Sequence, residues 1–157
     1  MFELLVVMAL ITVIAGIAIP TLSGATARNS VWTASEQIGS QIRQARLKAI
    51  SRNIRFRVRF DCPAAGQFRV LQVTGDVGID NAADRCNDSQ DYDSGVYVMP
   101  ANVSYGDDPP LLEVNSRGEF SSDKGIPAVI TVTYLGAGSS SRSLTMSKTG
   151  QISFEVY

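Results

Sequence analysis

The sequence predicts an α+β fold in which one long N-terminal helix packs on an antiparallel β-sheet domain. Three patterns lead to this prediction: an uncharged aliphatic run at the start, an apolar stripe at helical spacing after it, and alternating segments beyond residue 53. The length of 157 residues is about that of one domain. Sixteen of the 70 hydrophobic residues fall in the first 20 positions, which leaves 54 in the other 137, an ordinary share for a soluble domain.

The run from Leu4 to Ile19 contains no charged residue. As a helix it would span about 24 Å, whereas a bilayer core needs about 30 Å. Three interpretations remain open: a cleaved signal peptide, a buried core helix, or a membrane helix of which the sequence shows only part. Glu3 argues against the first, because a signal peptide carries Lys or Arg before its apolar region. A carboxylate at the edge of a membrane helix is costly and indicates a functional site with a cationic partner.

Beyond Pro20 the helical pattern continues. The next apolar residues recur at spacings of three and four, which predicts an amphipathic helix whose narrow stripe packs on the β domain. The stripe consists of Val31, Ala34, Ile38, Ile42, Ala45 and Ala49. Because glycine weakens a helix, we expect a weak point between the two halves at Gly24 and the small residues around it, Ser23 and Ala25. Pro20 can also kink or stop a helix.

The period then changes to two. Residues 54–60 alternate between apolar side chains and arginine, as in a half-buried strand. Six further segments have strand character and are separated by turn signals. They are Gln67–Thr74, Gly95–Met99, Leu111–Asn115, Ala128–Leu135, Arg142–Ser147 and Gln151–Val156. The turns at 136–141 and 148–150 suit hairpins.

The N-terminal residues resemble the helix of type IV pilins and type II secretion pseudopilins. The resemblance rests on Glu3 at the head of the aliphatic run and on Pro20, seventeen residues after it. It implies that a prepilin peptidase cuts a leader ending in Gly, that the new terminal amine is methylated, and that Glu3 neutralises the terminal amine of a neighbouring subunit. It also implies that the mature chain starts two residues before Met1, so we expect an upstream coding sequence for a basic leader.

Other segments resemble the GspH/FimT branch of minor pilins and pseudopilins. These are the helix end Ile42–Asn53 and the segments Asn115–Gly118 and Ser143–Ile152, which look like the middle and terminal hairpins of that branch. The resemblance implies a structural minor subunit of a type IV pilus or a type II secretion pseudopilus. Its partners would be other pilin or pseudopilin subunits in a helical filament.

The same resemblance implies the pilin fold and its organisation. Residues 1–20 would form a transmembrane or filament-core helix segment, residues 21–53 its amphipathic continuation, and residues 54–157 a periplasmic β domain. The subunit would cross the bacterial inner membrane once before it is incorporated into the filament. The choice between pilus and pseudopilus stays open at this point.

Cys62 and Cys86 are the two cysteines of the chain. In a domain that the resemblance places in the periplasm, they indicate one disulfide. It would close a loop of about 25 residues and stabilise the fold by about 3 kcal/mol on the chain-entropy model. A metal site and a redox pair are weaker alternatives, because no histidine accompanies the thiols and their separation does not match a CxxC motif.

Seven of the fourteen basic residues lie within residues 43–59, a stretch without an acidic residue. On a strand, Arg55, Arg57 and Arg59 would project from one face at about 7 Å intervals, which suits phosphate contacts. The alternative function is therefore that of a DNA-binding minor pilin for natural transformation. Against it, six aspartates within residues 76–93 are expected to neutralise the patch within the fold or between subunits.

Catalytic chemistry has little support. The chain has no histidine, which removes His-based general bases, Ser-His and Cys-His pairs and most zinc sites. The Gly136–Ser141 segment lacks the features of a nucleotide loop, and the aspartates of residues 84–93 fit no EF-hand spacing, so a calcium loop is the weaker interpretation. We therefore expect no enzyme, no cofactor and no metal.

Overall fold

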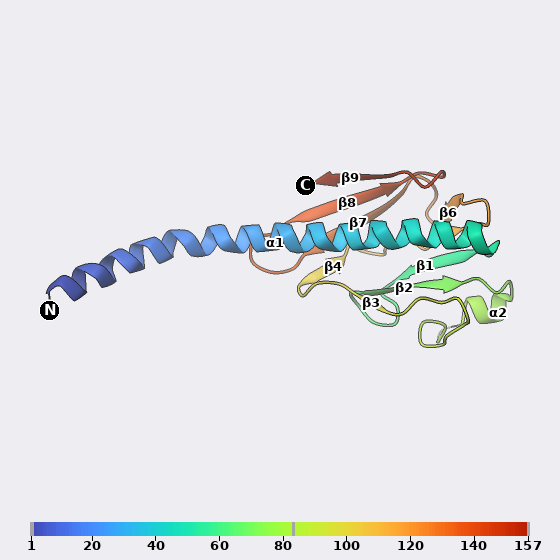
Figure 1. The fold of residues 1–157 in the computed structure, drawn as a ribbon, viewed down its shortest axis with the longest axis horizontal. Coiled ribbons are helices and arrows are strands. Elements are labelled where there is room, and N and C mark those ends of the chain that lie inside the picture. Colours follow the sequence, from blue (N-terminus) through green and yellow to red (C-terminus); the bar gives the residue numbers. More distant parts are fainter. Residues whose placement is uncertain (1, 83, 157) are drawn as a thin grey trace.

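The computed structural model describes residues 2–82 and 84–156, without the side chains of residues 17–23 and 156. The chain begins with the 51-residue helix α1 (Phe2–Arg52). In Figure 1 the N-terminal half of α1 extends away from the rest of the molecule, and its C-terminal half lies along the β-strands. The predicted long helix packed on antiparallel sheets is confirmed.

Two antiparallel sheets form within the described residues, in the orders β3-β2-β1-β5-β6 and β4-β7-β8-β9. The strands of the first sheet are β1 (Phe56–Phe60), β2 (Gln67–Gln72), β3 (Tyr97–Val98), β5 (Leu112–Val114) and β6 (Phe120–Ser122). The strands of the second are β4 (Val103–Tyr105), β7 (Ala128–Tyr134), β8 (Ser141–Met146) and β9 (Ile152–Val156). The backbone N–H of Phe120 donates to the carbonyl of Lys148 at 2.8 Å, which joins β6 to the turn before β9.

All seven predicted strand segments form strands, but β4, β6 and the short helix α2 (Val77–Asp80) were missed. β4 and β6 have three residues each. The similarly short β3 and β5 were found because they lie within longer segments of strand character, Gly95–Met99 and Leu111–Asn115. The helix α2 is only one turn long. The sequence feature that could have indicated it is the N-cap residue Asp76, whose side chain accepts a hydrogen bond from the N–H of Gly78 at 2.8 Å.

Neither the expected weak point at Gly24 nor Pro20 interrupts the helix, because the backbone of α1 is helical from Phe2 to Arg52. Glycine costs a helix only about 1 kcal/mol relative to alanine, and helix formation is cooperative with the turns on either side. The apolar run and the amphipathic segment therefore form one continuous helix, as predicted, which is seen as a gently curved stalk in Figure 1.

The core lies between α1 and both sheets. All six residues of the predicted stripe are buried, each at most 2% exposed, so this prediction is confirmed. Ala27, one helical turn before Val31, is also buried and extends the stripe. The inward side chains that pack against the stripe include Phe56, Val58, Leu112, Val114, Ile130, Val132, Leu144 and Met146. Alanines on the stripe allow strands of both sheets to approach the helix backbone closely.

Replacing Ile42 by alanine tests this packing. Ile42 is 1% exposed, and its truncation leaves a cavity, so we expect Ile42→Ala to lower the free energy of unfolding by about 2–5 kcal/mol. Leu47→Ala is the matched control on the same helix, because Leu47 is 67% exposed. It should change stability by less than about 0.5 kcal/mol. Urea unfolding measures both, and equal losses would contradict the assignment of the stripe.

Candidate assembly site

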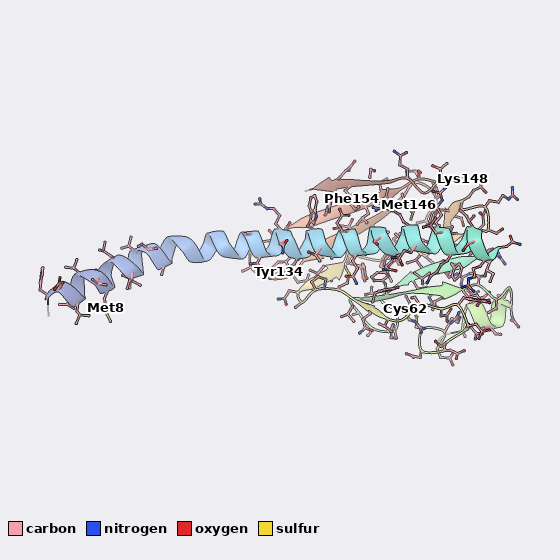
Figure 2. All side chains as sticks on the ribbon, in the orientation of Figure 1. Met8, Cys62, Tyr134, Met146, Lys148 and Phe154 are labelled. Carbon is pink, nitrogen blue, oxygen red and sulfur yellow. A yellow bond between two sulfur atoms is a disulfide. The ribbon has the colours of Figure 1, made fainter. Side chains whose placement is uncertain are left out.

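The N-terminal part of α1 exposes large apolar side chains on every side. Ten of them are between 44% and 79% exposed. They are Phe2, Leu4, Leu5, Val6, Val7, Met8, Leu10, Ile11, Val13 and Ile14. Figure 2 shows Met8 on this extended part of the helix, far from the strands. Monomeric soluble proteins rarely expose contiguous apolar surface of this extent, which makes the segment a candidate interaction surface.

Glu3 lies in the first turn of α1 and is exposed. Among the ion pairs formed between described residues, none includes Glu3. A carboxylate at a helix N-terminus is favoured by the helix dipole and can accept a cation from another molecule. The side chain of Pro20 is outside the described set, and its role as an assembly marker stays a prediction. Within the described residues, no helix has both the length and the hydropathy required to cross a membrane.

Segments that carried the family resemblance meet at the C-terminal part of α1. Nε of Arg46 donates a hydrogen bond to the carbonyl of Gly118 at 3.0 Å. Gly118 has φ +80°, and a Cβ there would lie 2.8 Å from Cδ1 of Ile50. Gly150, also at φ +80°, would place a Cβ 2.9 Å from the ring of Phe120 and 3.1 Å from Cδ of Arg46. Both glycines are therefore required by backbone conformation and by close packing, and this cluster holds the two hairpin turns on α1.

The predicted basic row, with Arg55 just before β1 and Arg57 and Arg59 on it, is largely paired within the fold. Arg55 and Arg57 each form an ion pair with Glu113 at 3.3 Å. Glu113 lies directly opposite Arg57 in the register of β1 and β5. Arg57 also donates to the carbonyl of Asp80 and to Oδ1 of Asn81, both at 3.0 Å. The main counter-ion is thus Glu113, which the sequence reasoning missed because strand pairing, not sequence distance, places it there.

Arg59 has a different environment. It lies opposite Arg69 on β2, and its Nη1 is buried without a hydrogen-bond partner among the described residues. Burial lowers the pKa of Arg59, and the positive charges of Arg57 and Arg85 lower it further. The three arginines therefore do not form a free row of cations, and DNA contact stays a prediction that this geometry does not favour.

Aspartates of the 76–93 segment are used inside the domain. Arg85 and Asp93 are almost fully buried and form an ion pair, with Nη1 and Oδ2 2.6 Å apart. Asp93 also accepts hydrogen bonds from the backbone N–H groups of Gln72 and Gln90. Burial alone would raise the pKa of Asp93, but these hydrogen bonds and the charge of Arg85 lower it overall.

Cys62 and Cys86 form the expected disulfide. The bridge ties the end of β1 to the irregular segment after α2, and Figure 2 places Cys62 beside the first sheet. The side chain of Arg69 donates to the carbonyls of Cys86, Asp88 and Ser94, so a buried guanidinium holds the same segment. Within residues 2–82 and 84–156, no group of three or more metal-ligating side chains is found.

Arg142 on β8 makes a contact that sequence reasoning missed. Its guanidinium lies 3.9 Å from the ring centroid of Trp32 and 4.1 Å from that of Phe154, and it pairs with Glu36 at 3.3 Å. A cation between two aromatic faces is well stabilised when it is shielded from water, and Arg142 is 5% exposed. This stack fastens β8 and β9 to α1. The sequence feature that could have indicated this contact is the spacing of Trp32 and Glu36, which lie one helical turn apart and so on the same face of α1.

A helical stalk with an exposed apolar half, followed by antiparallel sheets packed on its other half, defines a pilin-like protein. A sequence model of the family described as type II transport protein GspH matches residues 34–150. This chain belongs to that family. No curated protein sequence matches it.

Solved structures share the fold. The minor pseudopilin EpsH from the type 2 secretion system of Vibrio cholerae has a TM-score of 0.56 and 17% identity, covering 81% of this chain and 97% of EpsH. The type IV minor pilin FimU of Pseudomonas aeruginosa PAO1 has a TM-score of 0.52 and 16% identity, covering 83% of this chain and 91% of FimU. A second crystal form of FimU has a TM-score of 0.51 and 15% identity, covering 79% of this chain and 91% of FimU. The pilin fold that the resemblance implied is confirmed.

The close approach at Gly118 gives a testable prediction. In Gly118→Ala the alanine must adopt a left-handed backbone conformation and its Cβ must also displace Ile50. The variant should therefore lose more stability than a substitution that strains the backbone alone. Gly125→Ala is the matched control, because Gly125 has φ +87° and its added Cβ would have nothing within 4 Å. We expect the control to lose about 1–2 kcal/mol and Gly118→Ala clearly more. Thermal unfolding compares them; equal losses would mean that the turn does not pack tightly on α1.

The Arg85–Asp93 pair predicts a pH dependence. The pKa of Asp93 is lowered in the folded state, so the Asp93 carboxylate stabilises the fold. This stabilisation is complete above the pKa of Asp in the unfolded chain, near 4, and is lost as the pH falls through the pKa of the folded state. Asp93→Asn leaves Arg85 buried without its anion, so we expect a loss of about 3–5 kcal/mol at neutral pH.

The stability gap between the parent and Asp93→Asn should narrow as urea unfolding is repeated at decreasing pH. Asp84→Asn, at an exposed position, is the control and should track the parent at every pH. A gap that stays constant down to strongly acidic pH would show that the Asp93 charge does not stabilise the fold.

Proposed function

We propose that this chain is a structural minor subunit of a type IV pilus or a type II secretion pseudopilus, and that it assembles through the N-terminal half of α1. The observation that carries the proposal is the exposed apolar surface from Phe2 to Ile14 on a helix whose other half is packed. Membership of the GspH family and the shared pilin fold support the same role.

The apolar surface favours association with other helices of the same kind. Burying it against neighbouring subunits removes ten large side chains from water, at about 25 cal/mol for each Å² buried. Before assembly, the same surface would be stabilised by the acyl chains of the bacterial inner membrane, with the β domain in the periplasm. The subunit is then transferred from one apolar environment to another, so that little apolar surface meets water during the process.

Glu3 gives the contact its register. An aliphatic helix surface alone fixes its position along a neighbour only weakly, whereas one charged group among apolar helices must meet a cation to avoid a large desolvation cost. In our proposal that cation is the terminal amine of the adjacent subunit, exposed when a prepilin peptidase removes the leader. Repetition of one head-to-tail contact of this kind generates a helical filament.

The role of Glu3 is tested by Glu3→Ala. We expect the variant to be excluded from filaments while its β domain folds normally, because Glu3 is far from the core. Glu3→Asp, which keeps the charge on a shorter side chain, should restore part of the incorporation. The amount of subunit in sheared filaments, relative to total subunit, is the measurement.

Two controls accompany that experiment. Formation of the Cys62–Cys86 disulfide in each variant reports that the β domain has folded. Asp84→Asn removes an exposed carboxylate from the β domain and should leave incorporation unchanged. Normal incorporation of Glu3→Ala would refute the proposed register contact.

A further inference from the structure

The β domain has one end that faces the apolar half of α1. The loop between β7 and β8 is the part of the domain that reaches farthest along α1 toward its N-terminus (Figure 1). Residues 135–140 contain no charged side chain, and Leu135 is 70% exposed. The backbone N–H of Leu135 donates to the carbonyl of Asn102 at 2.7 Å, which fixes the loop to the equally uncharged residues 100–102.

α1 adds two side chains to this end of the domain. Arg28 and Trp32 line one small surface pocket together with Ser140 and Ser141, so the loop closes directly against the helix. Arg28 is exposed, and Trp32 is 53% exposed although its ring stacks on Arg142. We call the surface formed by Arg28, Trp32 and residues 135–140 the proximal surface.

The opposite end of the domain has different chemistry. Its turns carry charged side chains, among them Arg52 at the end of α1, Arg117 between β5 and β6, and Lys148 between β8 and β9. Figure 2 shows Lys148 at this far end and Tyr134, next to the proximal surface, at the near end. The two ends therefore differ in these loops and turns, although Arg28 and Glu155, which pairs with Ser143 in the register of β8 and β9, also lie toward the near end.

Spacing along α1 places the proximal surface near the edge of a bilayer. Arg28 is the first charged residue after Glu3, and their separation of 25 positions corresponds to about 38 Å of helix. A bilayer with its headgroups is about 40–45 Å thick. Side chains on a helix lean toward its N-terminus, so Trp32, one turn after Arg28, also reaches back toward this boundary. Trp and Arg are typical of the interfacial layer at the ends of membrane helices.

We propose that the proximal surface binds the phospholipid headgroup layer while the subunit waits in the membrane. Arg28 contacts lipid phosphates, the indole of Trp32 lies at the level of the headgroups, and Leu135 inserts its side chain at the top of the acyl layer. The contact holds the β domain against the bilayer and sets the angle of α1 before the filament takes up the subunit. This inference rests on the proposed insertion of α1.

Trp32 is the single tryptophan of the chain, so its fluorescence reports on this surface alone. The full chain is reconstituted into vesicles of phosphatidylcholine and phosphatidylglycerol, either plain or brominated on the acyl chains near the headgroup. We expect the brominated lipid to quench Trp32, and bromine at the chain ends to quench it much less. Vesicle flotation, measured on the same samples, reports insertion of α1 independently.

Leu135→Ser should reduce the quenching without changing flotation. The matched control is Leu47→Ser, because Leu47 is similarly exposed, at 67%, but lies near the far end of α1. The control should be quenched like the parent.

The outcomes separate the two proposals. A chain that does not float with vesicles would overturn the membrane step of the proposed function and this inference together. Flotation without quenching of Trp32 would overturn this inference alone. Trp32 that is shielded from an aqueous quencher but not quenched by lipid would show that a second subunit covers the surface instead. Equal quenching of the parent and Leu135→Ser would show that the loop between β7 and β8 does not contact the lipid.

Discussion

The packing of one narrow stripe of α1 against two sheets is the interaction on which the rest of the structure depends. Six predicted residues, together with Ala27, provide the helix side of the core, and three of the six are alanines. Small side chains allow β1 and β5 of one sheet and β7 and β8 of the other to approach the same helix. Because a sheet must bury one face, the helix is the common support without which neither sheet would have a core.

Polar contacts then fix the position of each sheet on the helix. Arg46 holds the two glycine turns, and Arg142, between Trp32 and Phe154, holds the second sheet. The irregular segment after α2 is held by a disulfide and by buried arginines rather than by apolar packing. A segment without regular strands has little apolar surface to bury, so directional hydrogen bonds and a covalent bond determine its shape.

The division of α1 into a packed half and an exposed half matches the division of tasks in our proposal. Stability comes from the packed half and the domain around it, and the proposal assigns the exposed half to assembly. In the β domain, the uncharged loops 100–102 and 135–140 lie toward the exposed half of α1, and turns with Arg117 and Lys148 lie at the other end. This arrangement suits a subunit that passes from a membrane into a filament, because in our proposal the same end of the molecule contacts the membrane first and the neighbouring subunits later.

The sequence by itself determined the long helix, its buried stripe, seven of the nine strands among the described residues, the disulfide pair and the family resemblance. These follow from periodicity and from motifs that are local in the chain. Only the tertiary structure decided that the strands form two sheets, that Glu113 pairs with Arg55 and Arg57, and that Arg142 lies between two rings. Such contacts join residues far apart in sequence, and their partners are chosen by strand register and by burial, which no local pattern encodes.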